Sequence, residues 1–503
     1  MSEPSTPTAG DPATLSGGAL VLGGLLLAVA NFLVVLDTTI ANVAVPHIAG
    51  GLAVSPSQGT YVITSYAVAE AVSVPLTGWI ASRFGTVRAF VVALLGFGLF
   101  SALCGLAPSI GLLSAFRVLQ GLFGGPLMPL SQTLLLKIFP PKQQPAALGL
   151  WAMTTLVAPI AGPILGGWLC DGAGWPAIFY INVPIAIACG LGGWRLLRRA
   201  ETAVRKTRID AVGLGLLVLW VGALQLMVDR GKELDWFNSP VIVGLAVVAG
   251  IGFAAFLIWE LTEADPIIPL RLFGRRGFSA AVFTLCVAFA GMFGSLVMTP
   301  LWLQSYMGYT ATWSGYATAM TGVLAVVAAP VAAQLAARFD PRRLVFLGVS
   351  WLAVIALVRS HATTEMSFWQ IAAPMLFMGV GMPFFFVPLM GLALGNVEPE
   401  DTAGASGLMN FARTMSGAIA TSWVTTHWEN AATLNRAELA GMIHPSAAPD
   451  LGLAGLDRLV QEQSVVLATN QTFLVVAGLF AAAAAAVWLA PRPTRTVDLA
   501  AAH

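Results

Sequence analysis

Long runs of apolar residues, separated by short polar segments, follow one another along the chain of 503 residues. Most runs hold about 20 residues, the length that an α-helix needs to cross the hydrocarbon core of a bilayer. The runs are continuous rather than alternating, which excludes a transmembrane β-barrel. We predict fourteen spanning helices, bounded by Pro, Gly or charged clusters, at 17–45, 58–81, 88–107, 109–136, 145–169, 176–195, 210–228, 239–259, 278–303, 313–336, 343–359, 368–393, 403–427 and 469–490.

The composition agrees with this pattern, because 57% of the residues are hydrophobic and only 10% are charged. About a quarter of the residues of a soluble protein are charged. We therefore expect an all-α integral membrane protein. The net charge of +1 gives no reason to expect a nucleic-acid partner. The four Cys and five His residues show no metal-ligand spacing.

The positions of the basic residues predict the orientation, since Lys and Arg are retained in short cytoplasmic loops. If both termini are cytoplasmic, most of the 25 Lys and Arg residues lie in inner loops and tails. A few, Arg359 among them, fall in outer loops. The even number of helices and the charge distribution together predict a multi-pass chain with both termini in the cytoplasm.

Two short basic loops resemble each other, GWIASRFGTVR after the second predicted helix and QLAARFDPRR after the tenth. They suggest two six-helix repeats with two helices inserted between them, a 6+2+6 arrangement that is typical of alternating-access transporters. The predicted parts are a tail at 1–16, an N-terminal bundle at 17–197, an insert at 198–262, a C-terminal bundle at 263–490 and a tail at 491–503.

One long polar segment, about 428–468, interrupts the C-terminal bundle on the outer side. Its sequence contains stretches with helical character. It can serve as a docking surface for a partner or be an ordinary loop, and both interpretations stay open here.

Ionisable residues inside predicted spans are rare, because each costs about 2.5–3.5 kcal/mol at mid-bilayer. The chain has four of them: Asp37, Glu70, Arg117 and Arg413. At a rise of about 1.5 Å per residue, Asp37 and Arg117 lie at similar depths, roughly 13 Å and 12 Å from the outer ends of their helices. We therefore expect the two side chains to pair.

A carboxyl group whose basic partner comes and goes can take up and release a proton. This property makes Asp37 and Glu70 candidates for proton coupling. The alternatives are a static tie between Asp37 and Arg117, and a protonated Glu70 that acts as an interhelical hydrogen-bond donor. Arg413 shares a helix face with Asn410, and it can bind substrate or satisfy backbone carbonyls where a helix is broken.

Small residues and prolines cluster in the fifth predicted helix, where they allow close packing and weaken the helical ladder. They are Pro159, Gly162, Pro163, Gly166 and Gly167. Flexible Met and aromatic side chains suit a promiscuous apolar site, although packing or lipid contact is the simpler role for them. The candidate cavity residues are Asp37, Glu70, Trp151, Met292, Phe293, Phe385, Asn410 and Arg413.

Several segments carry a family resemblance: LDTTIANVAVP, PLTGWIASRFG, FRVLQGLFGGPLMPLSQTLLL, MTTLVAPIAGPILGGW, FYINVP, RIDAVG, LMVDRGKELDWF, GYTATWSGYA and NFARTMSGAIATS. Together they extend over nearly the whole chain. The chain resembles the fourteen-helix drug:proton antiporters of the major facilitator superfamily.

The resemblance implies roles for individual residues. Asp37 matches the acid of the family's first-helix motif, and Arg117 and Gln120 match its proton-relay motif. The small residues of the fifth helix match its antiporter motif, which favours export over uptake. The family's gating loop is represented by Gly78, Arg83 and Gly85. In that loop Ser82, Thr86 and Val87 replace an acid and a basic pair, so a charge-based lock is not supported.

The function that the resemblance implies is multidrug efflux, and thus antibiotic resistance, driven by the proton-motive force without a cofactor. The implied location is the bacterial inner membrane, and the implied partners are a periplasmic membrane-fusion adaptor and an outer-membrane channel. A metabolite exporter or an uptake symporter of the same fold is the alternative. A membrane enzyme is disfavoured because no metal-spaced His, G-x-S-x-G or Walker A motif occurs. A scaffold role would leave the buried charges unexplained.

Overall fold

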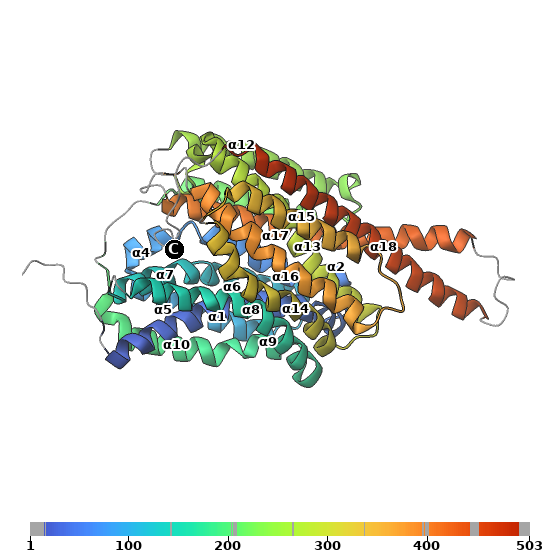
Figure 1. Cartoon of the computed structure of the whole chain (residues 1–503), viewed down its shortest axis with the longest axis horizontal. Helices are drawn as coiled ribbons and strands as arrows, with labels where there is room; N and C mark the ends of the chain where they lie inside the picture. The colour runs from blue at the N-terminus through green and yellow to red at the C-terminus, as the bar shows by residue number, and fades with distance from the viewer. Residues whose placement is uncertain are drawn as a thin grey trace, which may run out of the picture.

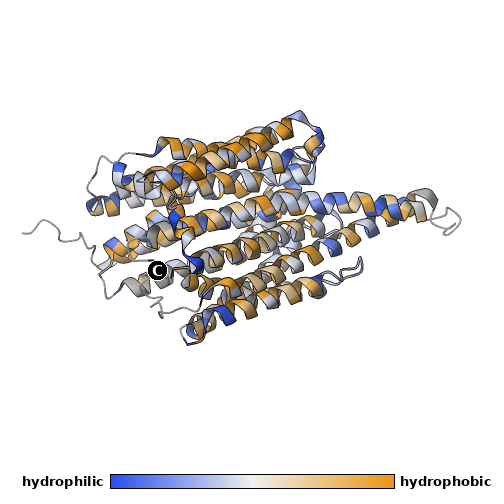
Figure 2. Ribbon diagram, turned by 90° about the horizontal axis from the view of Figure 1, so that it is seen from above, coloured by the Kyte–Doolittle hydropathy of each residue, from blue (hydrophilic) through white to orange (hydrophobic). Residues whose placement is uncertain are grey.

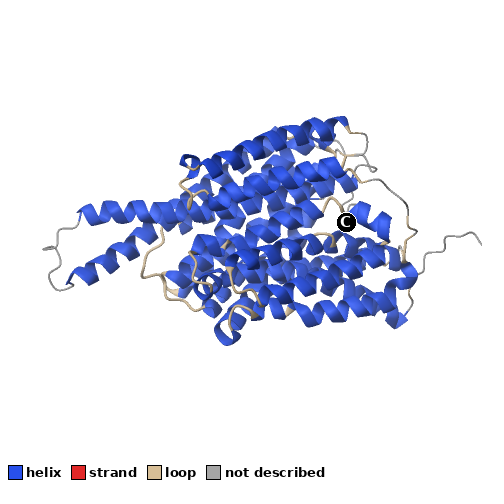
Figure 3. Cartoon of the chain, turned by 180° about the vertical axis from the view of Figure 1, so that it is seen from behind, coloured by secondary structure: helices blue, strands red, loops and turns tan. Residues whose placement is uncertain are grey.

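The structure is a computed structural model, and it describes residues 15, 17–140, 143–202, 204, 209–263, 266–336, 338–394, 397, 402–442 and 452–491. Within these residues the only regular secondary structure is helix (Figure 3). The long helices run roughly side by side in one bundle (Figure 1).

The first part of the chain forms ten α-helices, named here in chain order. They are α1 (Gly17–Gly51), α2 (Pro56–Gly59), α3 (Tyr61–Ser73), α4 (Thr77–Phe84), α5 (Thr86–Gly105), α6 (Ile110–Gly124), α7 (Leu127–Ile138), α8 (Gln144–Ala173), α9 (Ala177–Tyr180) and α10 (Asn182–Leu197).

The insert consists of α11 (Ala211–Arg230) and α12 (Pro240–Thr262), and the 3-10 helix η3 (Leu270–Gly274) connects it to the last part of the chain. That part contains α13 (Arg276–Ser305), α14 (Ala311–Ala336), α15 (Pro341–Arg359), α16 (Phe368–Leu394), α17 (Thr402–Met442) and α18 (Gly452–Ala486). Three further 3-10 turns, η1 (Arg198–Ala200), η2 (Trp236–Asn238) and η6 (Val487–Leu489), occur at helix ends.

Eleven helical segments of the described chain are long and apolar enough to cross a membrane. Apolar residues run along the length of the bundle, and hydrophilic residues gather toward its ends (Figure 2). The chain is therefore a multi-pass, all-helical membrane protein. The other three predicted spans fall on the α3–α4 pair, α8 and α17.

Two of the predicted spans are interrupted at a proline, and a third, 176–195, is divided into α9 and α10 at Ile181. The span predicted at 58–81 is divided into α3 and α4, and the span predicted at 109–136 is divided into α6 and α7. Pro75 and Pro126 lie at the two breaks. Proline has no backbone N–H and clashes with the preceding turn, which explains both interruptions.

The polar segment at 428–468 is not an irregular loop where the structure describes it. Helix α17 continues to Met442 and α18 begins at Gly452, so both helices extend beyond the bundle as a hairpin (Figure 1). The Arg436 guanidinium on one arm donates to Asp457 on the other at 2.8 Å. Residues 443–451 lie outside the described residues, and docking of a partner on this hairpin stays a prediction.

Two large apolar clusters fill the bundle. One contains Phe90 and Leu134 and is built from α1, α5, α7 and α10. The other contains Phe385 and Phe480 and is built mainly from α13 and α15–α18, together with residues of the insert such as Phe256. The clusters agree with two helix groups, and the limits of the predicted parts stay a prediction.

Helix α8 lies at the seam between the two groups, because it packs closely on both α1 and α14. A Cβ atom at Gly166 would lie 2.9 Å from the Ile40 carbonyl oxygen of α1. A Cβ atom at Gly167 would lie 2.5 Å from the Ala311 carbonyl oxygen, where α14 begins. The small residues that the sequence predicted for close packing do occupy a close helix contact.

We expect Gly167→Ala to destabilise the protein by about 1–3 kcal/mol, because overpacking a close contact forces the helices apart. The matched control is Gly172→Ala in the same helix, where a Cβ atom would meet nothing within 4 Å. Thermal unfolding of both purified variants in the same detergent measures the difference. Equal unfolding temperatures for the two variants would contradict the tight α8–α14 contact.

Candidate functional site

The centre of the site is an ion pair buried inside the first helix group. Asp37 lies on α1 and Arg117 on α6, and each is 1% exposed. The Arg117 Nη1 donates to Asp37 Oδ2 at 2.5 Å, and its Nε donates to the carbonyl oxygen of Val62 at 2.8 Å. The pairing predicted from their similar depths is thus present.

Two amides complete the hydrogen bonding of Asp37. Gln120 Nε2 donates to Asp37 Oδ1 at 3.1 Å, and Asn182 Nδ2 donates to the same oxygen at 2.7 Å. Asn182 also bonds Ser101 Oγ at 3.0 Å, while Arg117 donates to Gln120 Oε1 at 2.8 Å. The network therefore joins four helices, α1, α5, α6 and α10.

Asn182 and Ser101 were missed by the sequence analysis. The available signal was Asn182 itself, a polar side chain within the apolar segment FYINVP. Both residues are fully buried, and a buried polar group needs a hydrogen-bond partner.

Aromatic rings enclose the cationic side of the pair. The Arg117 guanidinium carbon lies 4.2 Å from the centre of the Tyr66 ring and 5.7 Å from that of Phe179. Such contacts stabilise a cation most strongly where water is excluded. The Tyr66 hydroxyl is buried without a hydrogen-bond partner, so a polar group capable of both donation and acceptance is available beside the pair.

This arrangement can respond to a proton. Ionised Asp37 accepts three hydrogen bonds from Arg117, Gln120 and Asn182. Protonation would remove the negative charge that holds the guanidinium and would weaken all three bonds. A change at one carboxyl group would therefore alter the ties among four helices.

Glu70 and Arg413 come from different helix groups, on two helices that pack against each other. Glu70 lies on α3 and Arg413 on α17, close enough for an electrostatic interaction. The Arg413 guanidinium carbon lies 5.5 Å from the centre of the Phe289 ring, and its buried Nε has no hydrogen-bond partner. Asn410 is partly buried one turn earlier on α17.

The other predicted cavity residues fall into two separate places. Met292 and Phe385 are packed in the apolar cluster of the second helix group, and Phe293 packs partly buried against it. Trp151 instead belongs to the first group, where its Nε1 donates to Ser131 Oγ at 3.0 Å. Met292 and Phe385 are therefore buried in the core of one helix group, and the substrate cavity predicted from the eight residues stays a prediction.

The predicted gating loop is held by an acid that the sequence analysis did not consider. Glu201 accepts from the backbone N–H groups of Val87 at 2.9 Å and Arg88 at 3.0 Å, at the start of α5. Gly85 has a φ of 90° and lies against this carboxylate. Arg83 ends α4 partly exposed, and Gly78 lies on the exposed side of that helix.

Arg359 does not lie in an outer loop, contrary to the orientation analysis. It is the last residue of α15 and is buried. Its guanidinium donates to Ser295 Oγ at 2.8 Å and to Thr299 Oγ1 at 2.5 Å, and stacks on Phe473 at 4.1 Å. The residue stood next to a polar turn in the sequence, where neither hydroxyl partner could be foreseen.

A second acidic junction, also missed, links the insert to both helix groups. Asp229 on α11 accepts from Gln225 at 2.7 Å, from Thr64 of α3 at 3.1 Å and from Ser422 of α17. Nearby, Lys232 donates to Glu429 of α17 at 2.5 Å. The sequence signal for this junction was Asp229, the first acid of LMVDRGKELDWF, which lies near a predicted helix end and was given no role.

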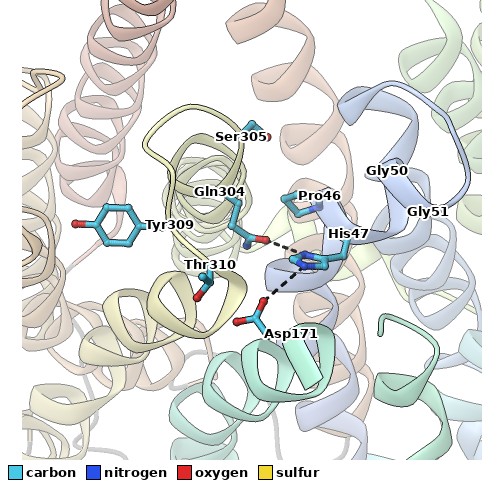
Figure 4. Close-up of a pocket in the computed structure, with 9 residues that line it drawn as sticks. All are labelled: Pro46, His47, Gly50, Gly51, Asp171, Gln304, Ser305, Tyr309 and Thr310. Atoms are coloured by element: carbon cyan, nitrogen blue, oxygen red, sulfur yellow. Dashed lines mark hydrogen bonds and ion pairs between the residues drawn. The ribbon is translucent and has the colours of Figure 1, made fainter. Parts of the chain in front are cut away.

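The same end of the bundle holds a shallow pocket of about 600 Å³ between α1, α8 and the α13–α14 connection (Figure 4). The Nδ1 atom of His47 lies 3.1 Å from Gln304 Oε1, and its Nε2 atom lies 3.6 Å from Asp171 Oδ1. Asp171 in turn accepts from the backbone N–H of Thr312 at 2.8 Å. These contacts tie α1 and α8 to α13 and α14, so they close this end of the interface.

Comparison with known proteins identifies the family of this fold and site. The family model described as Major Facilitator Superfamily matches residues 27–421. The chain belongs to the major facilitator superfamily. This is a family of transporters, and the resemblance found in the sequence motifs is confirmed.

Two relatives within the superfamily are similar over almost their whole length. Multidrug export protein EmrB of Escherichia coli (strain K12) is 42% identical over 95% of this chain and 97% of its own. Fatty acid resistance protein FarB of Neisseria gonorrhoeae is 41% identical over 95% of this chain and 97% of its own.

Solved structures share the major facilitator fold at low identity. A D-xylose-proton symporter has a TM-score of 0.64 and 13% identity, covering 95% of this chain and 100% of that one. A bacterial homologue of the human lysosomal transporter Spinster, inward-facing and occupied, has a TM-score of 0.63 and 17% identity, covering 95% and 97%. These similarities show the fold alone.

Within this major facilitator fold, we expect Arg117→Met to destabilise the protein by about 3–5 kcal/mol, because it leaves the Asp37 carboxylate buried and uncompensated. Adding Asp37→Asn removes that charge and should recover much of the loss. Thermal unfolding of the two single variants and the double variant gives the coupling free energy. Strictly additive effects would contradict a direct ionic interaction.

Proposed function

We propose that the chain is a proton-coupled antiporter that exports hydrophobic toxic compounds by alternating access. The observation that carries the proposal is the buried Asp37–Arg117 pair, in which one carboxylate accepts three hydrogen bonds from two other helices. A protonatable group of this kind converts proton binding into a change of helix contacts, which coupled transport requires.

The arrangement in the membrane forms part of the proposal. We infer fourteen spans in a 6+2+6 order, with both termini in the cytoplasm of a bacterial cell and the protein in its inner membrane. The distribution of basic residues supports this orientation. In this orientation the closed end with His47 and Asp229 is the outer end, so the structure corresponds to a state that is shut toward the outside.

The coupling cycle follows from the contacts at the seam. An outward opening must separate α8 from α14, break the bonds of Asp171 to the start of α14, and break the bond of Asp229 to either α3 or α17. Protons from outside would then reach Asp37, and its protonation would release Arg117. Return to the closed state would accompany proton release to the cytoplasm, so the proton gradient drives export.

The substrate class is inferred from two sources. The names of the relatives refer to multidrug export and fatty acid resistance. The interface between the helix groups offers Glu70 on α3, and Arg413 on α17 beside the Phe289 ring. Apolar compounds with a weak charge suit such surroundings, since aromatic and flexible walls tolerate varied shapes.

A proton-coupled metabolite exporter or an uptake symporter is the competing function. Counterflow in vesicles distinguishes the uptake symporter, because an antiporter moves its substrate against the direction of the protons. An imposed inward proton gradient should therefore drive substrate out of the compartment that receives the protons.

We expect Asp37→Asn to reduce proton-driven dye or drug transport in inverted vesicles to the level of vesicles without the protein. The amide keeps the size and an acceptor oxygen of Asp37, so the variant should remain folded and inserted. Asp457→Asn, on the exposed hairpin, is the matched control and should transport normally. Full coupled transport by Asp37→Asn would refute the proposed coupling site.

We also infer that the chain works with a periplasmic membrane-fusion adaptor (EmrA-like) and an outer-membrane channel (TolC-like). The helical hairpin of α17 and α18 reaches beyond the bundle and exposes Leu434 and Met442. Exposed apolar side chains on a polar extension are typical of a contact with another protein.

We expect a purified adaptor of this class to bind the full chain, and Leu434→Asp to weaken the binding at least tenfold. Biolayer interferometry with the chain in nanodiscs measures the affinity. The control variant is Glu438→Gln, on the same arm of the hairpin as Leu434. Leu474→Asp would not serve as a control, because Leu474 lies in the membrane-spanning part of α18. Unchanged affinity for Leu434→Asp would exclude this face of the hairpin.

A further inference from the structure

Two carboxyl groups meet at the end of the insert where α11 begins and α12 ends. Asp210 caps α11, and its Oδ1 accepts from the backbone N–H of Gly213 at 2.8 Å and from Trp259 Nε1 at 2.9 Å. Glu260 lies in the last turn of α12, and its Oε2 accepts from the backbone N–H of Ile268 at 2.9 Å. One oxygen of each carboxyl group is therefore satisfied by N–H donors.

The second oxygen of each group is buried without a partner. Asp210 Oδ2 and Glu260 Oε1 accept no hydrogen bond, and the Glu260 side chain is fully buried. Both oxygens approach Gly213, where a Cβ atom would lie 2.5 Å from Glu260 Oε1 and nearer still to Asp210 Oδ2. Because both oxygens lie within 2.5 Å of this one position, the two oxygens are less than twice 2.5 Å apart.

No positive charge compensates the two acids within the described part of the chain. Among the described residues, the charged groups that act on Glu260 are Asp210 and Glu263, both acidic. Arg271 of η3 donates to the main-chain oxygen of Glu263 at 3.3 Å and forms no ion pair with Asp210 or Glu260. Apolar side chains of the adjoining cluster, such as Phe256 and Leu272, surround the end of the insert.

Negative charge on both facing oxygens would be strongly repulsive in this apolar setting. A metal ion would need four or more ligands, whereas only two free oxygens converge here. One proton needs only two, because the protonated oxygen becomes a donor to the other. We propose that Asp210 and Glu260 form a binding site for a single proton, held between Asp210 Oδ2 and Glu260 Oε1.

The shared proton would join three segments. Asp210 caps α11, Glu260 ends α12, and Ile268 belongs to the connection that leads through η3 into α13. Without the proton, repulsion between the carboxylates would loosen the connection between the insert and the second helix group. This site is separate from the Asp37 network, so the inference does not rest on the proposed transport function.

Infrared spectroscopy of the full chain in nanodiscs at neutral pH tests the site. We expect the wild-type protein to show the carbonyl stretch of a protonated carboxyl group that is absent from Glu260→Gln. Asp210→Asn should lose the same single band, because in each variant the new amide donates to the remaining carboxylate. Asp37→Asn is the control and should retain the band.

The matched glycines separate proton sharing from helix capping. Gly213→Ala should shift or remove the band by driving the two carboxyl groups apart, whereas Gly215→Ala should not, since a Cβ atom there meets nothing within 4 Å. A band that survives in both Glu260→Gln and Asp210→Asn would overturn the proposal. A second result would also overturn the proposal. If Na⁺, K⁺ or Mg²⁺ stabilised the wild-type protein but not Glu260→Gln, the site would be a cation site.

Discussion

Lipid supplies no hydrogen-bond partners, so every polar group inside this bundle must find its partner in the protein. The Asp37 carboxylate satisfies this constraint with Arg117, Gln120 and Asn182, and its position fixes how α1 meets α6 and α10. The same carboxylate is the group whose charge a proton can cancel. The bonds that hold these helices together are therefore the bonds on which the proposed proton coupling would act.

The helix interface around α8 complements this polar network. Glycines bring the backbones of α1, α8 and α14 close together, so shape alone holds the two helix groups along much of the seam. The polar contacts of Asp171, His47 and Asp229 lie at one end of the seam. The two helix groups can slide or separate along the largely apolar seam without breaking many hydrogen bonds. Separation at the polar end breaks the hydrogen bonds of these residues.

Much of the fold could be predicted from the sequence, because bilayer thickness fixes helix length and a charge inside a span stands out. The pairing of Asp37 with Arg117 followed from depth alone. The sequence did not reveal Asn182 or Ser101 as partners, since neutral polar residues are common in membrane helices and only packing selects among them. Arg359 was assigned to a loop because its hydroxyl partners are distant in sequence.

Other differences have equally local causes. The polar composition of the segment at 428–468 suggested either a loop or a docking surface, but it was compatible with helices that continue into water. Pro75 and Pro126 were visible, yet whether a proline kinks or divides a membrane helix depends on the neighbours that replace the lost hydrogen bond. Asp210 and Glu260 lie fifty positions apart in the chain, so only the folded insert brings their oxygens together.

Helix α17 gives the hairpin a mechanical property. Its 41 residues run without interruption from Thr402 to Met442, a length of about 60 Å at 1.5 Å per residue. A rigid rod that pivots within the membrane displaces its far end in proportion to its length. A small rotation of α17 about its buried end would therefore displace the far end of the hairpin by a much larger distance.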